Sequence, residues 1–172
     1  MVEIKGQLYP TRVEEMTLKE WSNVSGIIQN GNISGIEKLE ALLTAIGVPQ
    51  KDIDDLPIDF SDKLAEAMKP SNEEFELVDH IGHYSLNLDR ELTVKLAKFI
   101  SKVNEQGLGI AGLVAVFYED ERVTTTEHYD LSHVKHKARI FDHMSAKDFV
   151  VSVAKITEFL AVKTKETLDE SK

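Results

Sequence analysis

Apolar residues recur every three or four positions along most of this chain, which is the spacing that places them on one face of an α-helix. The stripe Ile36, Leu39, Leu43 and Ile46 is an example, and it stops at Gly47. Stripes of this kind predict seven helices, at about residues 17–29, 34–46, 60–68, 92–103, 110–117, 131–141 and 149–160. The valines of the segment at 110–117 are also compatible with a buried strand, but its apolar residues have helical spacing, which favours a buried helix.

Several of these stripes begin at a residue that can cap a helix. Thr17 with Glu20, and Ser34 with Glu37, have the spacing of a capping box, in which each side chain accepts a hydrogen bond from the other residue's backbone N–H. Asp130 precedes the stripe at 131–141 and can act as its N-cap. Ser145 with Asp148 repeats the capping-box spacing before the last helix, and Pro70 closes the helix at 60–68.

Two stretches alternate in the shorter rhythm of β-strands. "VEIKGQLYP" at the N-terminus reads as a strand or hairpin around Gly6. In the centre, "FELVD" and "YSLNL" are separated by Ile81 and Gly82, which predicts a turn flanked by His80 and His83. "EDERVTTTEHYD" is then expected to be a polar connection. The fold class is therefore α+β and mainly α: short N-terminal and central β-hairpins with a bundle of amphipathic helices.

The chain's 172 residues and 42% hydrophobic content are enough for one domain over residues 1–172. Division into two subdomains, 1–70 and 71–172, is equally compatible, because each half begins with a hairpin signal followed by a helix. This order resembles a faint internal repeat, and chance similarity explains it equally well. The residues expected in the core are Trp21, Leu39, Leu43, Leu96, Phe99, Phe117, Phe141 and Phe159.

Charge and composition restrict the partners. Thirty acidic against 20 basic side chains give a formal net charge of −10, which disfavours nucleic-acid binding. There is no cysteine for a disulfide or a thiolate metal site. The longest apolar run, "IAGLVAVFY", is too short to span a membrane, so we expect no membrane partner.

The letters His80-Ile81-Gly82-His83 also form the ATP-binding signature of class I aminoacyl-tRNA synthetases, and "HMSAKD" loosely resembles its partner loop. That signature should open a helix, whereas here a turn is predicted and the next helix starts only after Asp89. A hairpin turn is the expected structure, and "HMSAKD" is explained as a helix entry. No phosphate-binding loop, dinucleotide fingerprint or nucleophile elbow is present. We therefore expect a non-enzyme with no catalytic residue and no cofactor.

Histidines gather between positions 128 and 143. His133 and His136 are three residues apart and could chelate a divalent ion if His128, Asp142 or His143 completed the shell. Solvated helix histidines are the alternative, and no metal ligand is assigned from this pattern.

The same region predicts a basic outer helix face, with His133, Lys135, His136, Lys137 and Arg139 turned away from the core. On an acidic protein this face favours an acidic partner. Lys135, His136 and Arg139 are the candidate partner-binding residues.

The N-terminal portion has a short strand signal followed by the "TLKEW" helix entry. Further along, an apolar segment is followed by a "YD" and an "RIFDHM" helix, at Leu113, Ala115, Phe117, Tyr118, Tyr129, Asp130, Arg139, Phe141 and Met144. The first portion resembles the tail assembly chaperones of tailed bacteriophages, and the second resembles phage morphogenesis proteins.

This resemblance implies a tail assembly chaperone that binds tape-measure or tube proteins in the host bacterial cytoplasm. A structural virion subunit of the tail, baseplate or connector is the alternative, and self-association into a homo-oligomer is compatible with both. A metal- or nucleotide-dependent enzyme is the third class, which bound zinc or ATP would reveal.

Overall fold

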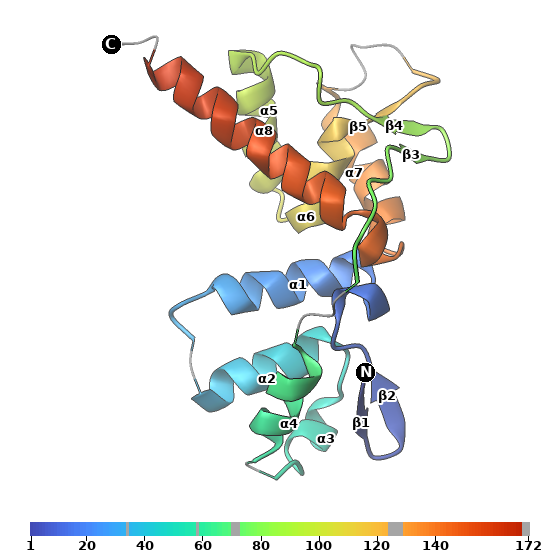
Figure 1. Cartoon of the computed structure of the whole chain (residues 1–172), viewed down its shortest axis with the longest axis vertical. Coiled ribbons are helices and arrows are strands. Elements are labelled where there is room, and N and C mark those ends of the chain that lie inside the picture. Colours follow the sequence, from blue (N-terminus) through green and yellow to red (C-terminus); the bar gives the residue numbers. More distant parts are fainter. Residues whose placement is uncertain (34, 58, 70–72, 124–128, 170–172) are drawn as a thin grey trace. The chain divides into compact units, whose positions relative to one another are not determined.

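The computed structural model describes residues 1–33, 35–57, 59–69, 73–123 and 129–169, the last six by their backbone only. These residues form eight α-helices, an N-terminal β-hairpin and a three-stranded antiparallel sheet, so the predicted mainly helical α+β class is confirmed. The chain divides into two compact units. Unit 1 comprises Met1–Glu74 with Ser145–Lys147, and unit 2 comprises Phe75–Met144 with Asp148–Lys172 (Figure 1).

Unit 1 begins with the predicted hairpin. Strands β1 (Val2–Ile4) and β2 (Gln7–Tyr9) pair antiparallel. Lys5 and Gly6 form the turn, with φ of 50° and 81°, the left-handed geometry that two-residue hairpin turns require. Four helices follow, α1 (Leu18–Gln29), α2 (Gly35–Ala45), α3 (Gln50–Ile53) and α4 (Phe60–Ala67), as well as a short 3-10 turn at Val13–Glu15.

The Thr17–Glu20 capping box at the start of α1 is confirmed: the Glu20 backbone N–H donates to Thr17, and the Thr17 backbone N–H donates to Glu20. Ser34 and Pro70, predicted to start one helix and to end another, lie outside the described residues. Ile36 was expected in the apolar stripe of α2 but is 60% exposed, because the buried face of this helix is limited to its C-terminal half.

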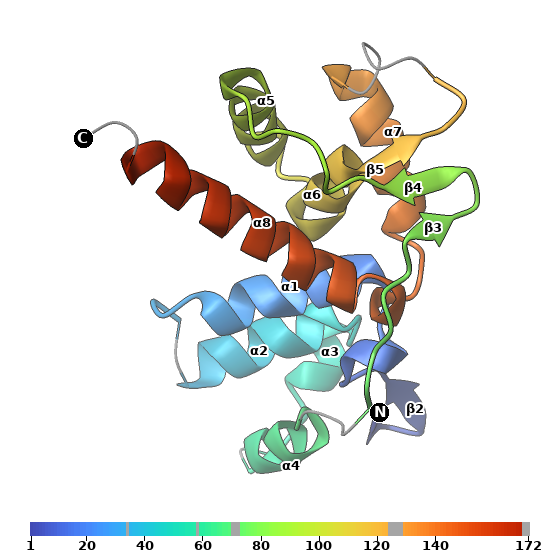
Figure 2. The same ribbon diagram turned by 45° about the horizontal axis from the view of Figure 1, so that its top comes forward.

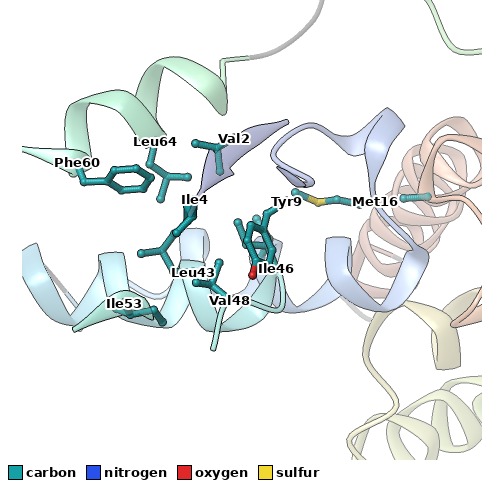
Figure 3. Close-up of a cluster of buried hydrophobic side chains, with 12 residues drawn as sticks. Val2, Ile4, Tyr9, Met16, Leu43, Ile46, Val48, Ile53, Phe60 and Leu64 are labelled. Carbon is teal, nitrogen blue, oxygen red and sulfur yellow. The ribbon is translucent and has the colours of Figure 1, made fainter. Parts of the chain in front are cut away.

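Apolar side chains from the hairpin and the helices meet in the core of unit 1 (Figure 3). Val2 and Ile4 are buried while Glu3 between them is exposed, so the period-two alternation of β1 directs one face inward. The segment at 145–147 completes this unit. Ala146 is fully buried, its backbone N–H donates to the Met16 carbonyl at 2.9 Å, and Ser145 forms a bridge with Thr17.

Unit 2 contains a three-stranded sheet with the strand order β3-β4-β5. Strands β3 (His80–Ile81) and β4 (Tyr84–Leu86) form a central hairpin, and β5 (Tyr118–Asp120) adds to β4. The first strand of this hairpin was predicted at 75–79, which is wrong, because these residues form no strand and β3 follows directly after them. The sequence had assigned Glu119 and Asp120 to a polar connection. That prediction was wrong, because the chain passes directly from a buried helix into this short strand.

Helix α6 (Gly109–Phe117) is the predicted buried helix at the centre of unit 2, and it packs against α5 (Val94–Asn104), α7 (Leu131–Phe141) and α8 (Val150–Asp169) (Figures 1 and 2). Gly112 lets α6 approach its surroundings closely: a Cβ there would lie 2.5 Å from the Leu108 Cβ and 3.1 Å from a Val103 methyl. Aromatic rings fill the space towards the sheet, with Phe141 contacting Tyr84, Tyr118 and Phe149 edge-on or tilted.

The predicted core set is largely confirmed. Leu43, Leu96, Phe99, Phe117 and Phe141 are buried, whereas Trp21, Leu39 and Phe159 are partly buried against the cores of their units.

The prediction that Ser145 opens the last helix was wrong. A 3-10 turn at Ala146–Asp148 comes first, and α8 begins only at Val150. Within the described chain, no helix combines the length and the apolar character needed to cross a membrane.

Candidate functional site

Helix α7 presents the predicted basic face. Its N-terminus is capped as expected, with the Ser132 backbone N–H donating to the Asp130 carboxylate at 2.9 Å. The inner side chains Val134, Ala138 and Phe141 are buried. His136 and Arg139 are exposed and Lys135 is partly exposed, so all three candidate partner-binding residues reach the surface.

The α7 face, defined as Lys135, His136 and Arg139, places two positively charged side chains and one histidine at the surface. In the part of the chain that the structure describes, none of the three forms an ion pair. Ile140 lies one turn from His136 and is 39% exposed, which adds an apolar contact beside the charges. Arginine is one of the residues enriched in protein interfaces.

Lys137 does not belong to this face, which corrects the sequence prediction. Three residues after Val134 and four before Phe141, it occupies the inner side of α7 and is 1% exposed. Its Nζ donates a hydrogen bond to the Tyr118 carbonyl at 2.7 Å. Burial lowers the pKa of Lys137 from 10.5 to about 8, and the nearby carboxylate of Glu119 acts in the opposite direction.

The hydrogen bond from Lys137 occupies a backbone carbonyl on the outer edge of β5, the edge that does not pair with β4. The Phe117 carbonyl accepts a hydrogen bond from the Asn87 N–H, and the Glu121 N–H donates to the His83 carbonyl, so both residues bond towards β4. Because successive residues of an antiparallel strand bond to opposite sides, the carbonyls of Tyr118 and Asp120 lie on the other edge of β5. The Tyr118 carbonyl accepts from Lys137, and the Asp120 carbonyl accepts from the N–H of the following turn at 3.2 Å. A sheet edge that would otherwise be open to strand pairing is thereby closed.

The two hairpin histidines face carboxylates, which is unfavourable for holding phosphate. His80 Nδ1 lies 3.0 Å from Asp79 and its Nε2 lies 3.6 Å from Glu121, and the hydrogen bond that His80 donates to Asp79 raises the pKa of His80. His83 lies beside Arg122 and 3.6 Å from the carboxylate of Asp120. A hairpin turn is present as predicted, but it lies at Gly82 and His83, one residue later than expected, because Ile81 pairs with Tyr84. The next helix begins only at Val94.

Asp120 is the most strongly perturbed acid of this group. Its side chain is 2% exposed, and its two oxygens accept hydrogen bonds from the backbone and the guanidinium of Arg122 at 2.9–3.0 Å. The hydrogen bonds from the Arg122 side chain hold the pKa of Asp120 far below its usual value. This carboxylate is therefore suited to fixing the turn after β5, since a group that stays ionised makes a poor proton donor.

A partly buried ion pair, between Arg90 and Glu119, was not anticipated from the sequence. The Arg90 guanidinium donates to Glu119 and to the Val116 carbonyl, both at 3.1 Å, and it lies over the rings of Phe117 and Tyr129. Arg90 is separated from Glu119 by 29 positions. No local pattern connects residues so far apart, so only the folded arrangement reveals the pair.

The histidine-rich stretch does not assemble a metal shell within the described residues, where no group of three or more histidine or acidic side chains could hold an ion. His136 and His143 are exposed, and His133 is partly buried. His128, which the sequence offered as a further ligand, lies outside the described residues.

An open apolar depression of about 340 Å³ lies beside the middle of α8. Its apolar wall comes from Leu88, Phe159 and Val162, and Val162 is 46% exposed. Lys155, Glu158 and Lys163 surround it with mixed charge.

Comparison of the chain with protein-family models, with curated protein sequences and with solved structures gives no match. The site is therefore interpreted from its own residues and from the motif-level resemblance described above.

Proposed function

We propose that the protein is a non-enzymatic protein-binding protein of bacteriophage tail morphogenesis, which works in the host bacterial cytoplasm as a tail assembly chaperone. Its partner is a tape-measure or tube protein, bound through the α7 face. The observation that carries this proposal is the exposure of Lys135, His136 and Arg139 on a helix whose other side is anchored in the core.

Electrostatics support an acidic partner surface at this helix. The chain as a whole has a formal charge of −10, so a local cluster of basic side chains is a distinct feature of its surface. At physiological ionic strength the Debye length is about 8 Å, so an approaching protein responds mainly to the charges that lie within about this distance of it. Such charges chiefly accelerate association and set its salt dependence.

The buried titratable groups of unit 2 also favour binding over catalysis. Lys137 is engaged by a carbonyl, Asp120 by Arg122, and Glu119 by Arg90. Each of these contacts holds a strand or a turn in place. A catalytic acid, base or nucleophile instead needs access to its substrate.

The proposal is tested with the partner that co-purifies from infected cells, identified by mass spectrometry. A Lys135→Glu, Arg139→Glu double variant should fold normally, because exposed charges contribute little to stability. Its association rate should fall about tenfold or more at low salt, and the salt dependence should flatten. Lys19→Glu with Lys51→Glu, two exposed positions of unit 1, is the matched control with the same change in charge.

Equal rates for the wild type and the α7 variant across the salt range would reject the α7 face as the binding site. Purified virions test the role itself, because a chaperone should be absent from them. Presence at a fixed copy number would replace the chaperone role with that of a structural virion subunit.

A further inference from the structure

Helix α5 carries a row of lysines that the sequence patterns did not single out. Its eleven residues, VKLAKFISKVN, include three lysines and no aspartate or glutamate. Lys95, Lys98 and Lys102 are spaced by three and four positions, which places them on one side of the helix, next to the buried stripe that faces α6. All three are exposed. We call these three residues the α5 lysine row.

No member of the α5 lysine row forms an ion pair within the described residues. The acid next to it in sequence is Glu105, the C-cap of α5, three positions after Lys102. The Nζ of Lys95 lies 4.3 Å from the centre of the Tyr129 ring, a cation–π contact that leaves the charge in place. Like charges three or four positions apart on a helix repel each other, so an anion bound along the row would relieve this repulsion.

The dimensions of the row define what would fit it. With a rise of about 1.5 Å per residue, Lys95 and Lys102 are separated by roughly 10 Å along the helix axis. Carboxylates at three- and four-residue intervals on a second helix have the same spacing. Val94, at the start of α5, is 73% exposed and offers an apolar contact at the end of the row.

We propose that the α5 lysine row is a docking surface for an acidic helix of a partner protein. A short helix fits better than nucleic acid or an anionic membrane, because an extended polyanion would also meet the other charges of a chain whose net charge is −10. A segment of about two helical turns lies within the local field of the three lysines. This surface is separate from the α7 face and does not depend on a role in phage assembly.

The test uses the full-length protein and a synthetic helical peptide with glutamates at three- and four-residue intervals on one side, labelled for fluorescence anisotropy. The peptide should bind at low ionic strength, and more weakly at physiological ionic strength. A Lys95→Gln, Lys98→Gln, Lys102→Gln variant should lose at least about tenfold in affinity. Glutamine keeps the helix propensity of lysine, so the circular dichroism spectrum should be unchanged.

Two controls separate the row from general charge. Lys19→Gln, Lys51→Gln, Lys63→Gln changes the net charge equally at exposed positions of unit 1 and should leave binding within about twofold. A peptide of the same composition with its glutamates distributed around the helix should bind more weakly. Equal losses in both triple variants, indifference to the glutamate arrangement, or tighter binding to duplex DNA or to phosphatidylserine vesicles would each overturn the proposal. Because these variants leave Lys135 and Arg139 intact, such a failure is distinguishable from failure of the α7 face.

Discussion

Replacing Lys137 by methionine should abolish a pH dependence of stability that the wild-type protein shows above pH 8. In the folded state the Lys137 pKa is about 8, against 10.5 for an ordinary lysine. Each pKa unit corresponds to about 1.4 kcal/mol, so burying the charged form costs roughly 3 kcal/mol. The hydrogen bond to the Tyr118 carbonyl offsets part of this cost, since an unpaired buried carbonyl costs about 1–3 kcal/mol.

The direction of this pH dependence of stability follows from the lowered pKa of Lys137. As the pH rises through 8, the folded protein releases the Lys137 proton while the unfolded chain retains it. Stability therefore increases with pH, by about 1.5 kcal/mol between pH 8 and 9.5. Methionine has no proton to release, so Lys137→Met should show a flat profile over this interval. Near pH 7 its stability should lie within about 2 kcal/mol of the wild type, because the removed charge and the lost hydrogen bond act in opposite directions.

Urea unfolding followed by circular dichroism measures this difference. The upper limit of pH 9.5 is important, because burial raises the pKa values of Tyr84 and Tyr118, and both would subtract stability once the pH exceeded their unfolded value of 10.0. Trp21, the only tryptophan, reports on unit 1 by fluorescence and serves as an internal reference. Parallel profiles for the wild type and Lys137→Met, or an NMR titration that places the Lys137 pKa near 10.5, would refute the reasoning.

The remaining predictions concern the turn after β5 and the packing of α6. Because hydrogen bonds from Arg122 lower the pKa of Asp120, the stabilising effect of its ionised form is complete above pH 4 and is lost as the pH falls further. The unfolding free energy of Asp120→Asn should therefore fall less steeply below pH 4 than that of the wild type. An equally steep fall in both proteins would contradict this. Gly112→Ala should lower the unfolding free energy by about 1–3 kcal/mol, because the clashes with Leu108 and Val103 outweigh a gain of about 1 kcal/mol in helix propensity. Equal or higher stability in urea unfolding would show that α6 shifts to accommodate the methyl group.

Features determined by neighbouring residues were the ones that the sequence predicted well. The Thr17–Glu20 capping box, the turn at Lys5–Gly6 and the turn at Gly82 each depend on a few consecutive residues. The position of Lys137 could have been read in the same way. Lys137 lies three residues after Val134 and four before Phe141, a spacing that places it on the buried side of α7. The prediction placed it on the outer side because lysine is charged.

Features that depend on distant partners could not be read from local patterns. Strand β5 is three residues long, and its partner β4 lies more than thirty positions earlier in the chain. It follows the apolar run of α6 directly, so no change in the sequence pattern marks where the strand begins. The pairing of Arg90 with Glu119 is equally remote. For the candidate site, sequence periodicity predicted the exposure of Lys135, His136 and Arg139, whereas the α5 lysine row was overlooked because only the apolar face of that helix was considered.

The return of the chain to unit 1 at Ser145–Lys147 has a consequence for biosynthesis. Ala146 fills a fully buried position, and its N–H bonds to Met16, yet it is synthesised some seventy residues after the rest of that unit. At ribosomal rates of about 5–20 residues per second, several seconds pass before this position can be occupied. On the ribosome, the core of unit 1 therefore stays incomplete until α7 and the segment that follows it have been synthesised. A nascent chain arrested before Ser145 should accordingly be more sensitive to protease in its first 70 residues than one arrested well after Lys147.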